Sequence, residues 1–260
     1  MSLLEIKNIS LSFGGLKAVN DVTLHVDTGE IVSLIGPNGA GKTTIFNILT
    51  GIYKIETGEI FFEGAAIHTK TPQDIVKAGI ARTFQNIRLF RNMRVIENVL
   101  IGSHIIAPYG FFHAVFRTRR FKESERKNTL NAVRLLRDVG LLGRTHDYAS
   151  NLPYGDQRKL EIARALATGA KIILLDEPAA GMNPQESEEL LRFILSLREQ
   201  GYTIIMIEHD MNVVMHISDR IYVLDYGRLI AHGLPHEVVN NPKVIEAYLG
   251  GVPNAQNQQP

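Results

Sequence analysis

The chain has 260 residues, of which 45% are hydrophobic, and this is enough for one core domain or for a core with a subdomain. Its longest apolar runs are far shorter than the roughly 20 residues of a membrane-spanning helix, and a formal net charge of +1 excludes a global field that would gather nucleic acid. The N-terminus has no basic stretch followed by a long apolar one, and the chain has no cysteine. These features predict an intracellular protein without a secretory signal.

The N-terminal quarter alternates strand patterns with one helix. Residues 3–9, 18–26 and a segment near 59–62 have strand patterns, and we expect them to form an antiparallel layer. The run "IVSLI" (31–35) lacks polar alternation, which is typical of a parallel strand buried on both faces. It is followed by "GKTTIFNILTG" (41–51), a helix that begins at a glycine turn.

The remainder contains a helical region, two more buried strands and a hairpin. Between about 84 and 165 the pattern is mostly helical. The runs "IILLD" (172–176) and "TIIMIE" (203–208) repeat the buried-strand pattern, so they predict further parallel strands. The hairpin-like "RIYVLDYGRLIAHG" (220–233) is expected to add to the antiparallel layer.

A helix is expected between the last two buried strands. Asn183 is its predicted N-cap, Pro184 lies in its first turn, and Glu186 is at the third position of a capping box. Gly201 is expected to end it.

This order of elements predicts an α/β fold with a mainly parallel core sheet, an N-terminal antiparallel β layer and an inserted helical subdomain. We expect a single domain over residues 3–250. Its α/β core would comprise about 1–84 and 166–250, and its helical subdomain about 85–165. The last residues, 251–260, form a polar tail that is expected to be disordered.

The segment "GPNGAGKT" has the spacing G-x-x-x-x-G-K-[ST] of a phosphate loop. Its glycines let the backbone turn N–H groups toward phosphate oxygens, and the helix N-terminus adds a partial positive charge. Lys42 would reach the β- and γ-phosphates, and the Thr43 hydroxyl would ligate Mg²⁺. The position between a buried strand and a helix disfavours the alternative, a glycine-rich turn without a ligand. The expected nucleotide contacts are Gly36, Pro37, Asn38, Gly39, Ala40, Gly41, Lys42, Thr43 and Thr44.

Two carboxylates follow the buried strand at 172–176. Asp176 would hold Mg²⁺, and Glu177 would orient or deprotonate an attacking water. Such strand ends lie where open α/β sheets bind ligands. In isolation "DEP" is more often a solvated strand end, but together with a phosphate loop it indicates a nucleotide hydrolase.

These motifs resemble those of the ATP-binding subunits of ABC transporters, and the resemblance covers about residues 3–249. "GPNGAGKTT" resembles the family's Walker A motif and "IILLDE" its Walker B motif. "NLPYGDQRKLEIARAL" (151–166) takes the place of the signature segment, usually written L-S-G-G-Q. The resemblance implies a P-loop NTPase of the ABC ATPase type, in which two ATPase domains face each other and the signature loop of one covers the γ-phosphate held by the other.

The signature segment departs from this consensus. Gly155 and the helix after it could present backbone N–H groups to a phosphate, and the resemblance places Gly155, Asp156 and Gln157 at the nucleotide. Pro153 stands at the family's serine, Tyr154 at its first glycine and Asp156 at its glutamine. The serine contact with the γ-phosphate is therefore missing, and an ordinary helix N-terminus remains the alternative reading.

Four further positions match family motifs individually. Gln85 resembles the Q-loop glutamine, which touches Mg²⁺ or the attacking water, and His209 resembles the switch histidine at the γ-phosphate. Phe13 lies where the family places an aromatic ring against adenine, with core packing as an equal alternative. Asn183 replaces the aspartate of the D-loop, so its capping role is better founded than a role between subunits.

Several long segments further resemble the larger ATPase subunit of branched-chain amino acid importers. The stretch 103–127 fits that subunit and is aromatic and then basic, which suits a membrane surface or a partner, although such a charge run more commonly marks a solvated helix face. The other matching segments are "SFGGLKAV", "RTFQNIRLFRNMRVIENV", the Y-G-D-Q form of the signature, "EPAAGMNP", "IEHDMNVVMHISDRIYVLDYG" and "EAYLGG".

The resemblance implies an ATPase that uses ATP and Mg²⁺ at the cytoplasmic face of the inner membrane, as a peripheral protein. Its partners would be a second ATPase subunit in a homodimer or heterodimer, two transmembrane permease subunits and, indirectly, a solute-binding protein, with no nucleic acid. The alternatives are another ABC system, such as lipopolysaccharide export, or a nucleotide-binding scaffold without turnover. Selectivity for the solute would lie in other chains.

Overall fold

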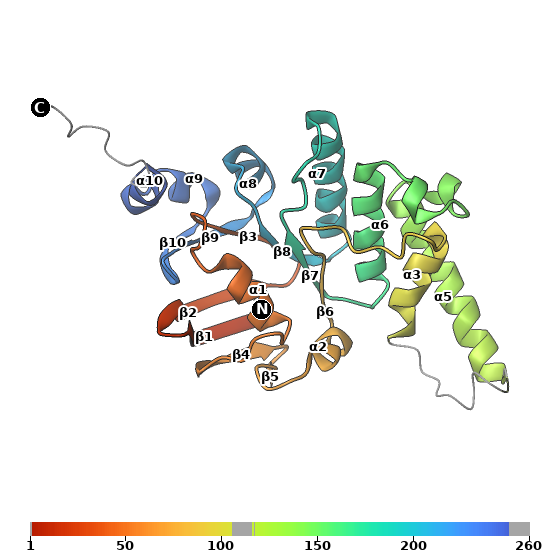
Figure 1. Ribbon diagram of the computed structural model, residues 1–260, viewed down its shortest axis with the longest axis horizontal. Coiled ribbons are helices and arrows are strands. Elements are labelled where there is room, and N and C mark those ends of the chain that lie inside the picture. Colours follow the sequence, from red (N-terminus) through yellow and green to blue (C-terminus); the bar gives the residue numbers. More distant parts are fainter. Residues whose placement is uncertain (1, 106–115, 117, 250–260) are drawn as a thin grey trace, which may run out of the picture. The chain divides into compact units, whose positions relative to one another are not determined.

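The computed structural model describes residues 2–105, 116 and 118–249 (Figure 1). These fall into two compact units, one comprising the described residues up to Thr69 and from Ile205 onward, the other Lys70–Ile204. The expected helical region at 85–165 lies within the second unit, and its boundaries stay predictions. The expected tail at 251–260 and part of the 103–127 segment lie outside the described residues.

The first unit contains two groups of strands and four helices among its described residues. They are β1 (Ser2–Phe13), β2 (Leu16–Asp27), β3 (Ile31–Ile35), α1 (Lys42–Leu49), β4 (Thr57–Phe62), β5 (Ala65–Ala66), α8 (Met211–Ile217), β9 (Arg220–Asp225), β10 (Arg228–Gly233), α9 (Pro235–Val239) and α10 (Pro242–Leu249). The strand β8 (Thr203–Ile207) carries the chain into this unit from the other one.

The predicted antiparallel layer is present. β1 pairs with β2 on one side and with β4 on the other, and β5 continues from β4. Along β1 the buried side chains Leu4 and Ile6 flank the half-exposed Glu5, as expected for a sheet with one covered face. All strands in this layer come from the N-terminal quarter of the chain.

The hairpin at 220–233 does not join that layer, so this expectation was wrong. β9 and β10 are antiparallel to each other, but β9 pairs in parallel with β3, from Val32 opposite Arg220 to Ile35 opposite Val223. The physical reason lies in the burial of the strands. Ile221, Tyr222, Val223 and Leu224 are all buried, as are all five residues of β3, and such continuous burial is typical of parallel pairing.

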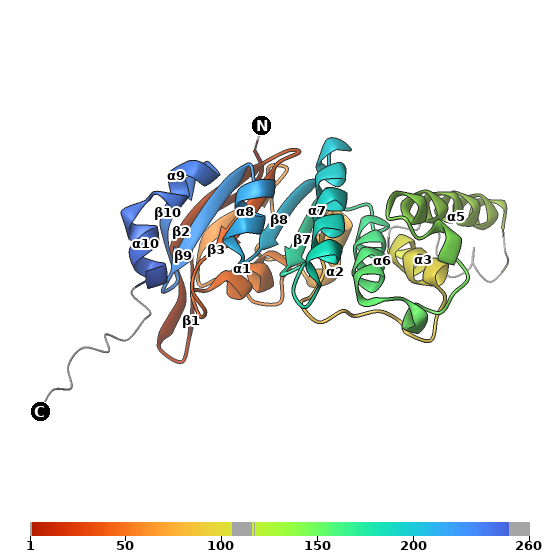
Figure 2. The ribbon, with the colours of Figure 1, turned by 90° about the horizontal axis from the view of Figure 1, so that it is seen from above.

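An apolar cluster attaches the C-terminal helices to these parallel strands. It joins Ile35 of β3 and Val223 of β9 to Val214 of α8, Val238 of α9 and Val244 of α10. Each such side chain contributes about 1.5–3 kcal/mol when fully buried. Figures 1 and 2 both show α9 and α10 beside β9 and β10. Because Ile35 is part of the cluster, these contacts stabilise β3, the strand that leads into the phosphate loop.

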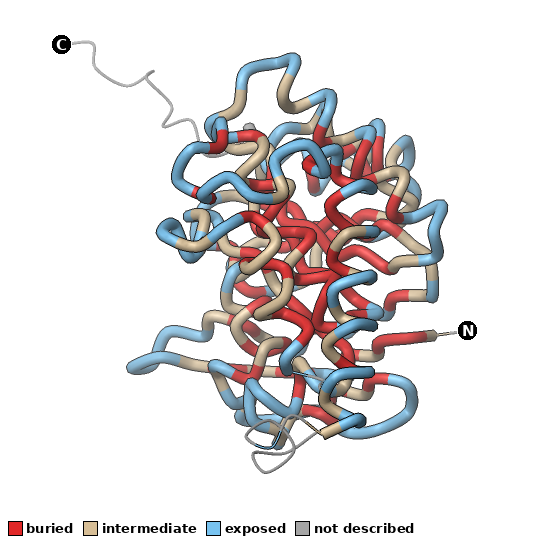
Figure 3. The backbone as a smooth tube through the Cα atoms, turned by 90° about the vertical axis from the view of Figure 1, so that its right-hand side faces the viewer, coloured by how far each residue is buried: buried red, intermediate tan, exposed pale blue. Residues whose placement is uncertain are grey.

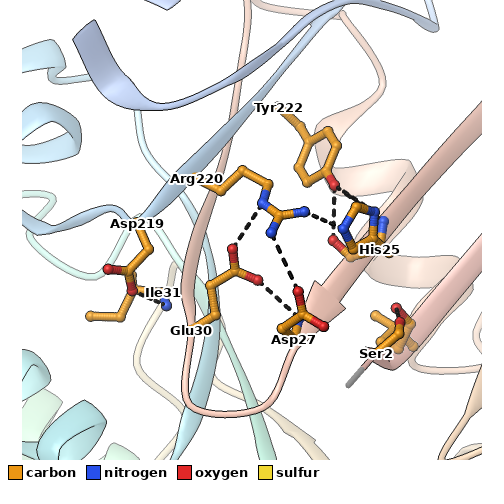
Figure 4. A network of polar contacts seen from close by, with 9 residues as sticks. Ser2, His25, Asp27, Glu30, Ile31, Asp219, Arg220 and Tyr222 are labelled. Carbon is orange, nitrogen blue, oxygen red and sulfur yellow. Dashed lines mark hydrogen bonds and ion pairs between the residues drawn. The ribbon is translucent and has the colours of Figure 1, made fainter. Parts of the chain in front are cut away.

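A polar network links the end of β2 to the start of β9 (Figure 4). The Arg220 guanidinium lies 2.8 Å from a Glu30 carboxylate oxygen and 3.4 Å from Asp27, and it also contacts the His25 ring. The Tyr222 hydroxyl donates to the His25 carbonyl at 2.9 Å. These contacts hold the turn between β2 and β3 against β9.

The second unit combines two strands with helices. Its elements are α2 (Pro72–Ala78), β6 (Ile80–Arg82), α3 (Val95–His104), α5 (Arg119–Asp138), two short 3₁₀ helices (Leu142–Arg144 and Ala149–Asn151), α6 (Tyr154–Leu166), β7 (Ile172–Asp176) and α7 (Pro184–Glu199). β6 and β7 are parallel, and α6 packs against α3, α5 and α7 (Figure 1). Every residue of β7 is buried, as predicted.

The predicted cap of α7 is confirmed. The Asn183 side chain accepts from the Glu186 backbone N–H at 2.9 Å, and the Glu186 carboxylate accepts from the Asn183 N–H at 3.1 Å. Pro184 occupies the first turn, and Gly201 follows the helix in the left-handed region at φ 89°. This capping box, together with the proline, sets where α7 begins.

In α5 the described basic residues form a solvated helix face. Arg119, Arg120 and Lys122 are exposed, whereas Leu135 and Leu136 on the other side are buried. Among the described helices, none is both long enough and apolar enough to cross a bilayer. Figure 3 shows buried segments in red on the inside and exposed ones in pale blue on the outside.

Candidate nucleotide site

The phosphate loop has the predicted strand–loop–helix context. It begins at Gly36, directly after β3, and α1 begins at Lys42 with Gly41 as its N-cap. Gly36 and Gly41 lie in the glycine-favoured region at φ 145° and 102°. The first-turn N–H groups of an eight-residue helix therefore face the loop, as an anion site requires.

Gly36 has no room for a side chain. A Cβ atom there would lie 2.0 Å from the Leu224 carbonyl oxygen, which belongs to the neighbouring strand β9. The Gly227 N–H donates to the Ala40 carbonyl at 3.0 Å, so the turn after β9 also holds the far end of the loop. The parallel pairing of β3 with β9 thus shapes the phosphate loop directly.

Lys42 folds back over the loop. Its ammonium donates to the Gly36 carbonyl at 2.7 Å and to the Pro37 carbonyl at 2.9 Å. These neutral acceptors keep the ammonium beside the loop, where a triphosphate would offer it charged acceptors. Thr43 is exposed and Thr44 partly buried in the first turn of α1.

A cavity of about 850 Å³ borders the outer side of the loop, within the volume range of small-molecule pockets. It touches loop residues 37–40 but not Lys42 or Thr43. The rest of the wall comes from the start of β2, the end of β9 with the turn after it, β10 and α10, through Leu16, Asp225, Tyr226, Ile230, Lys243, Glu246 and Ala247.

Two predicted nucleotide contacts, Phe13 and His209, lie exposed at the surface of the first unit. Phe13 is 45% exposed, so it is not a core residue, and its ring meets Tyr53 edge-on at 5.1 Å between centroids. His209 is exposed between β8 and Asp210, the N-cap of α8. Both rings are accessible to a ligand, and their roles toward adenine and the γ-phosphate stay predictions.

Asp176, the expected Mg²⁺ ligand, forms a buried ion pair that the sequence did not indicate. Its Oδ2 lies 2.6 Å from Arg82 Nη2, and the two side chains are only 8% and 5% exposed. Arg82 ends β6, and Asp176 ends the parallel neighbour β7. Because desolvating two charges is costly, such a pair is stable only while both partners are present.

We expect Arg82→Met to lower the free energy of unfolding by about 3–5 kcal/mol, since it leaves the Asp176 carboxylate buried without its cation. Arg192→Met is the matched control. Arg192 pairs with Glu188 at 3.6 Å on the exposed face of α7, where loss of an ion pair costs about 0–1 kcal/mol. Urea denaturation of both variants measures the difference, and equal losses would contradict a special role for the buried pair.

The structure brings two predicted site residues together. Gln85 Nε2 donates to Glu177 Oε2 at 2.8 Å, although the residues are 92 positions apart in the chain. Glu177 adopts φ 46°, a left-handed conformation that costs a non-glycine residue of order 1–3 kcal/mol. Strain of this kind persists where surrounding structure over-determines it and is concentrated at functional sites.

The signature segment forms the start of α6. Pro153 is the N-cap, and Gly155 lies buried in the first turn, with the Glu186 side chain 3.6 Å from the position of a Cβ. Gly155 has no positive φ, and a Cβ there would make only ordinary van der Waals contact with Glu186, so neither the backbone conformation nor the packing requires glycine. The expected helix N-terminus is confirmed, while its contact with a nucleotide stays a prediction.

The side chains around Gly155 are engaged within their own unit. Asp156 lies 3.8 Å from the Arg144 guanidinium, and the Gln157 amide donates to the Leu152 carbonyl at 2.8 Å. The Tyr154 hydroxyl donates to the Ala180 carbonyl at 3.2 Å, which joins the start of α6 to the segment before α7. Backbone groups, rather than these side chains, are therefore the part of the segment available to a phosphate.

The residues proposed for Mg²⁺ fit that ion by donor chemistry. Thr43, Gln85 and Asp176 offer hydroxyl, amide and carboxylate oxygens, the ligand type that Mg²⁺ prefers. Within the described residues there is no cluster of three or more His, Cys, Asp or Glu side chains that could hold a metal. Mg²⁺ usually takes one or two protein carboxylates together with substrate phosphates.

Comparison with known families agrees with this set of motifs. Residues 19–180 match the family model described as "ABC transporter", and residues 228–253 match one described as "Branched-chain amino acid ATP-binding cassette transporter". The chain is 49% identical over 249 residues to the high-affinity branched-chain amino acid transport ATP-binding protein LivG of Escherichia coli, covering 95% of this chain and 98% of that protein. It is 45% identical to BraF of Pseudomonas aeruginosa, with the same coverage.

Solved structures show the same fold. The ADP conformation of an ATP-binding cassette of an ABC transporter superposes with a TM-score of 0.84 at 34% identity, covering 96% of this chain and 99% of that one. A dimeric post-hydrolysis state of another ATP-binding cassette, bound to ADP and Pi, gives 0.73 at 25% identity, covering 89% and 98%. The chain therefore belongs to the ATP-binding proteins of the ABC transporter family, in the group that includes LivG and BraF.

Proposed function

We propose that this chain binds and hydrolyses ATP to power a branched-chain amino acid importer. The hydrogen bond of 2.8 Å between Gln85 and Glu177 carries the catalytic part of the proposal, because it joins the two residues assigned to the attacking water. The transported solute follows from the relatives LivG and BraF, which are branched-chain amino acid transport ATP-binding proteins.

The phosphate-binding role belongs to the first unit. The backbone of residues 36–44 and the Lys42 ammonium would hold the β- and γ-phosphates, and Thr43 would offer its hydroxyl to Mg²⁺. Phe13 would stack on adenine through its exposed ring. The carbonyls that Lys42 now contacts would be exchanged for phosphate oxygens, which are stronger, charged acceptors.

The hydrolytic role needs a base, and Glu177 is the residue proposed for it. Its carboxylate would take a proton from, or orient, the attacking water, while Gln85 holds that carboxylate and His209 contacts the γ-phosphate. Bound Mg²⁺, with Asp176 and Gln85 among its proposed ligands, would neutralise charge on the phosphates.

The signature segment is proposed to act on a nucleotide held by a second ATPase subunit. The N-terminus of α6 would add the first-turn backbone N–H groups of Gly155 and Asp156 and a helix dipole to that phosphate, whereas the Gln157 N–H already donates to the Pro153 carbonyl at 2.9 Å. ATP bound in this way favours the closed pair in proportion to its differential affinity for that state. A post-hydrolysis dimer of a related cassette supports pairing with a second ATPase subunit, in a homodimer or a heterodimer.

The transporter would also contain two transmembrane permease subunits and receive solute from a binding protein. We place the chain at the cytoplasmic face of the membrane, held there by the permeases. The choice of this importer over lipopolysaccharide export rests on residues 228–253, which match the branched-chain family model, and on relatives matched over nearly their whole length.

Uptake of labelled leucine in cells that lack this gene tests the solute. We expect the parent gene to restore uptake and the Lys42→Ala gene to restore less than about a tenth of it, because the ammonium that binds the phosphates is lost. Lys7→Ala, at an exposed position of β1, is the control and should restore uptake fully. Restoration of leucine uptake by Lys42→Ala, or failure of the parent gene to restore it, would refute the assignment.

A further inference from the structure

Two charged side chains of α6 are fully buried and lie outside the predicted site. Arg158 is 0% exposed and Glu161 is 1% exposed, and their Nη1 and Oε2 atoms are 2.8 Å apart. Even an ion pair pays several kcal/mol per buried charge unless further hydrogen bonds satisfy its remaining donors and acceptors. The groups that bond to those remaining donors and acceptors therefore show which part of the protein the pair holds in place.

The partners are backbone groups of the Gln85 loop, which we define as residues 83–94 between β6 and α3. The Arg158 guanidinium donates to two successive carbonyls, those of Phe84 at 2.6 Å and Gln85 at 2.7 Å. Glu161 Oε1 accepts from the Arg88 N–H at 3.0 Å. Three main-chain groups of an irregular segment are thus bound by one helix turn.

Gln85 is consequently held through both its main chain and its side chain. Its carbonyl is bound by Arg158 of α6, and its side chain donates to Glu177. The neighbouring Phe84 ring lies under the Arg88 guanidinium, 4.3 Å from its carbon to the ring centroid, which further limits movement of the loop. A fixed main chain directs the side-chain amide toward the Glu177 carboxylate.

We infer that Arg158 and Glu161 are positioning residues for ATP hydrolysis, which hold the Gln85 backbone so that its amide meets Glu177. This inference rests on the proposed roles of Gln85 and Glu177. It also gives the start of α6 a mechanical link to the hydrolytic residues, because Arg158 lies one turn after Gly155 on the same helix. A displacement of α6 would move the Gln85 main chain with it.

Arg158→Lys tests the inference in the purified full-length chain. Lysine keeps the positive charge beside Glu161, but its ammonium lacks the planar fork that spans two carbonyls. We expect kcat for ATP hydrolysis to fall about tenfold or more, as misplaced catalytic groups generally cause, with KM and the affinity for a non-hydrolysable ATP analogue within about twofold of the parent. Lys159→Met, on the same helix but paired with Glu189 at 3.2 Å, should leave kcat unchanged.

A double-mutant cycle separates positioning from general support of the fold. In a Gln85→Ala background, Arg158→Lys should lower kcat no further, because the group that it positions is already absent. A tenfold loss that persists in this background, or a parental kcat for Arg158→Lys alone, would overturn the inference. If Arg158→Lys does not fold, the double variant Arg158→Gln, Glu161→Gln replaces it, since it leaves no unpaired buried charge and its amides can still hydrogen-bond part of the loop backbone. The same kcat loss and the same cycle are expected from it.

The test distinguishes this inference from the proposed function. Parental hydrolysis by Glu177→Gln would refute the role of Glu177 itself. Loss of hydrolysis in Glu177→Gln with normal hydrolysis in Arg158→Lys would refute only the positioning role.

Discussion

Glu177→Gln is expected to reduce ATP turnover by about 10²–10⁴-fold, the usual contribution of a positioned general base. Glutamine keeps the size of the side chain and an oxygen that can accept from Gln85, so the local structure should survive. It cannot take a proton from water. ATP binding, which depends on the phosphate loop, should stay within a few-fold of the parent.

The same variant should accumulate as an ATP-dependent dimer, because the bridging triphosphate is no longer cleaved. Size-exclusion chromatography with and without ATP, alone and with the partner ATPase, measures this, and phosphate release measures turnover. Glu188→Gln is the control, since Glu188 lies on the exposed face of α7. Turnover at the parental rate in Glu177→Gln would remove the carboxylate from the mechanism.

Gly36→Ala should disable nucleotide binding. Its Cβ would meet the Leu224 carbonyl oxygen at 2.0 Å, and alanine rarely adopts φ 145°. Relief of the clash requires the loop or β9 to move, and the backbone conformation alone costs of order 1–3 kcal/mol. We expect a loss of affinity for an ATP analogue of about tenfold or more, with a fall in the thermal midpoint.

Gly29→Ala provides a matched control for the backbone effect. Gly29 also has a positive φ, 75°, but a Cβ there meets nothing within 4 Å, and the residue lies in the turn before β3. It should lower stability by about 1–2 kcal/mol and leave affinity for the analogue unchanged. If both variants lost the same affinity for the analogue, the loss in Gly36→Ala would be due to backbone strain and not to the clash with the Leu224 carbonyl of β9.

Local patterns in the sequence predicted much of this architecture. The phosphate loop, the Asn183 capping box and the buried run at 172–176 each depend on residues within a few positions of one another. Their backbone preferences act locally, so composition and spacing are sufficient to find them. The antiparallel layer was recognisable for the same reason.

The contacts that organise the hydrolytic residues were not predictable in this way. Arg82 meets Asp176 across 94 positions, and Arg158 reaches the Gln85 carbonyl across 73. A lone arginine in a helix or at a strand end usually lies at the surface, and no spacing rule distinguishes a buried one. The prediction for the hairpin at 220–233 failed similarly, because its hairpin-like pattern suggested the antiparallel layer while the buried run in its first strand pairs in parallel with β3.

Glu177 also sets a limit on engineering. Its φ of 46° suits glycine, so a stabilisation campaign that scores residues by conformational preference would replace this position early. The resulting variant would gain thermal stability and would lose ATP hydrolysis. The strained backbone at Glu177 is therefore a position where stability is lower so that the residue can act in hydrolysis.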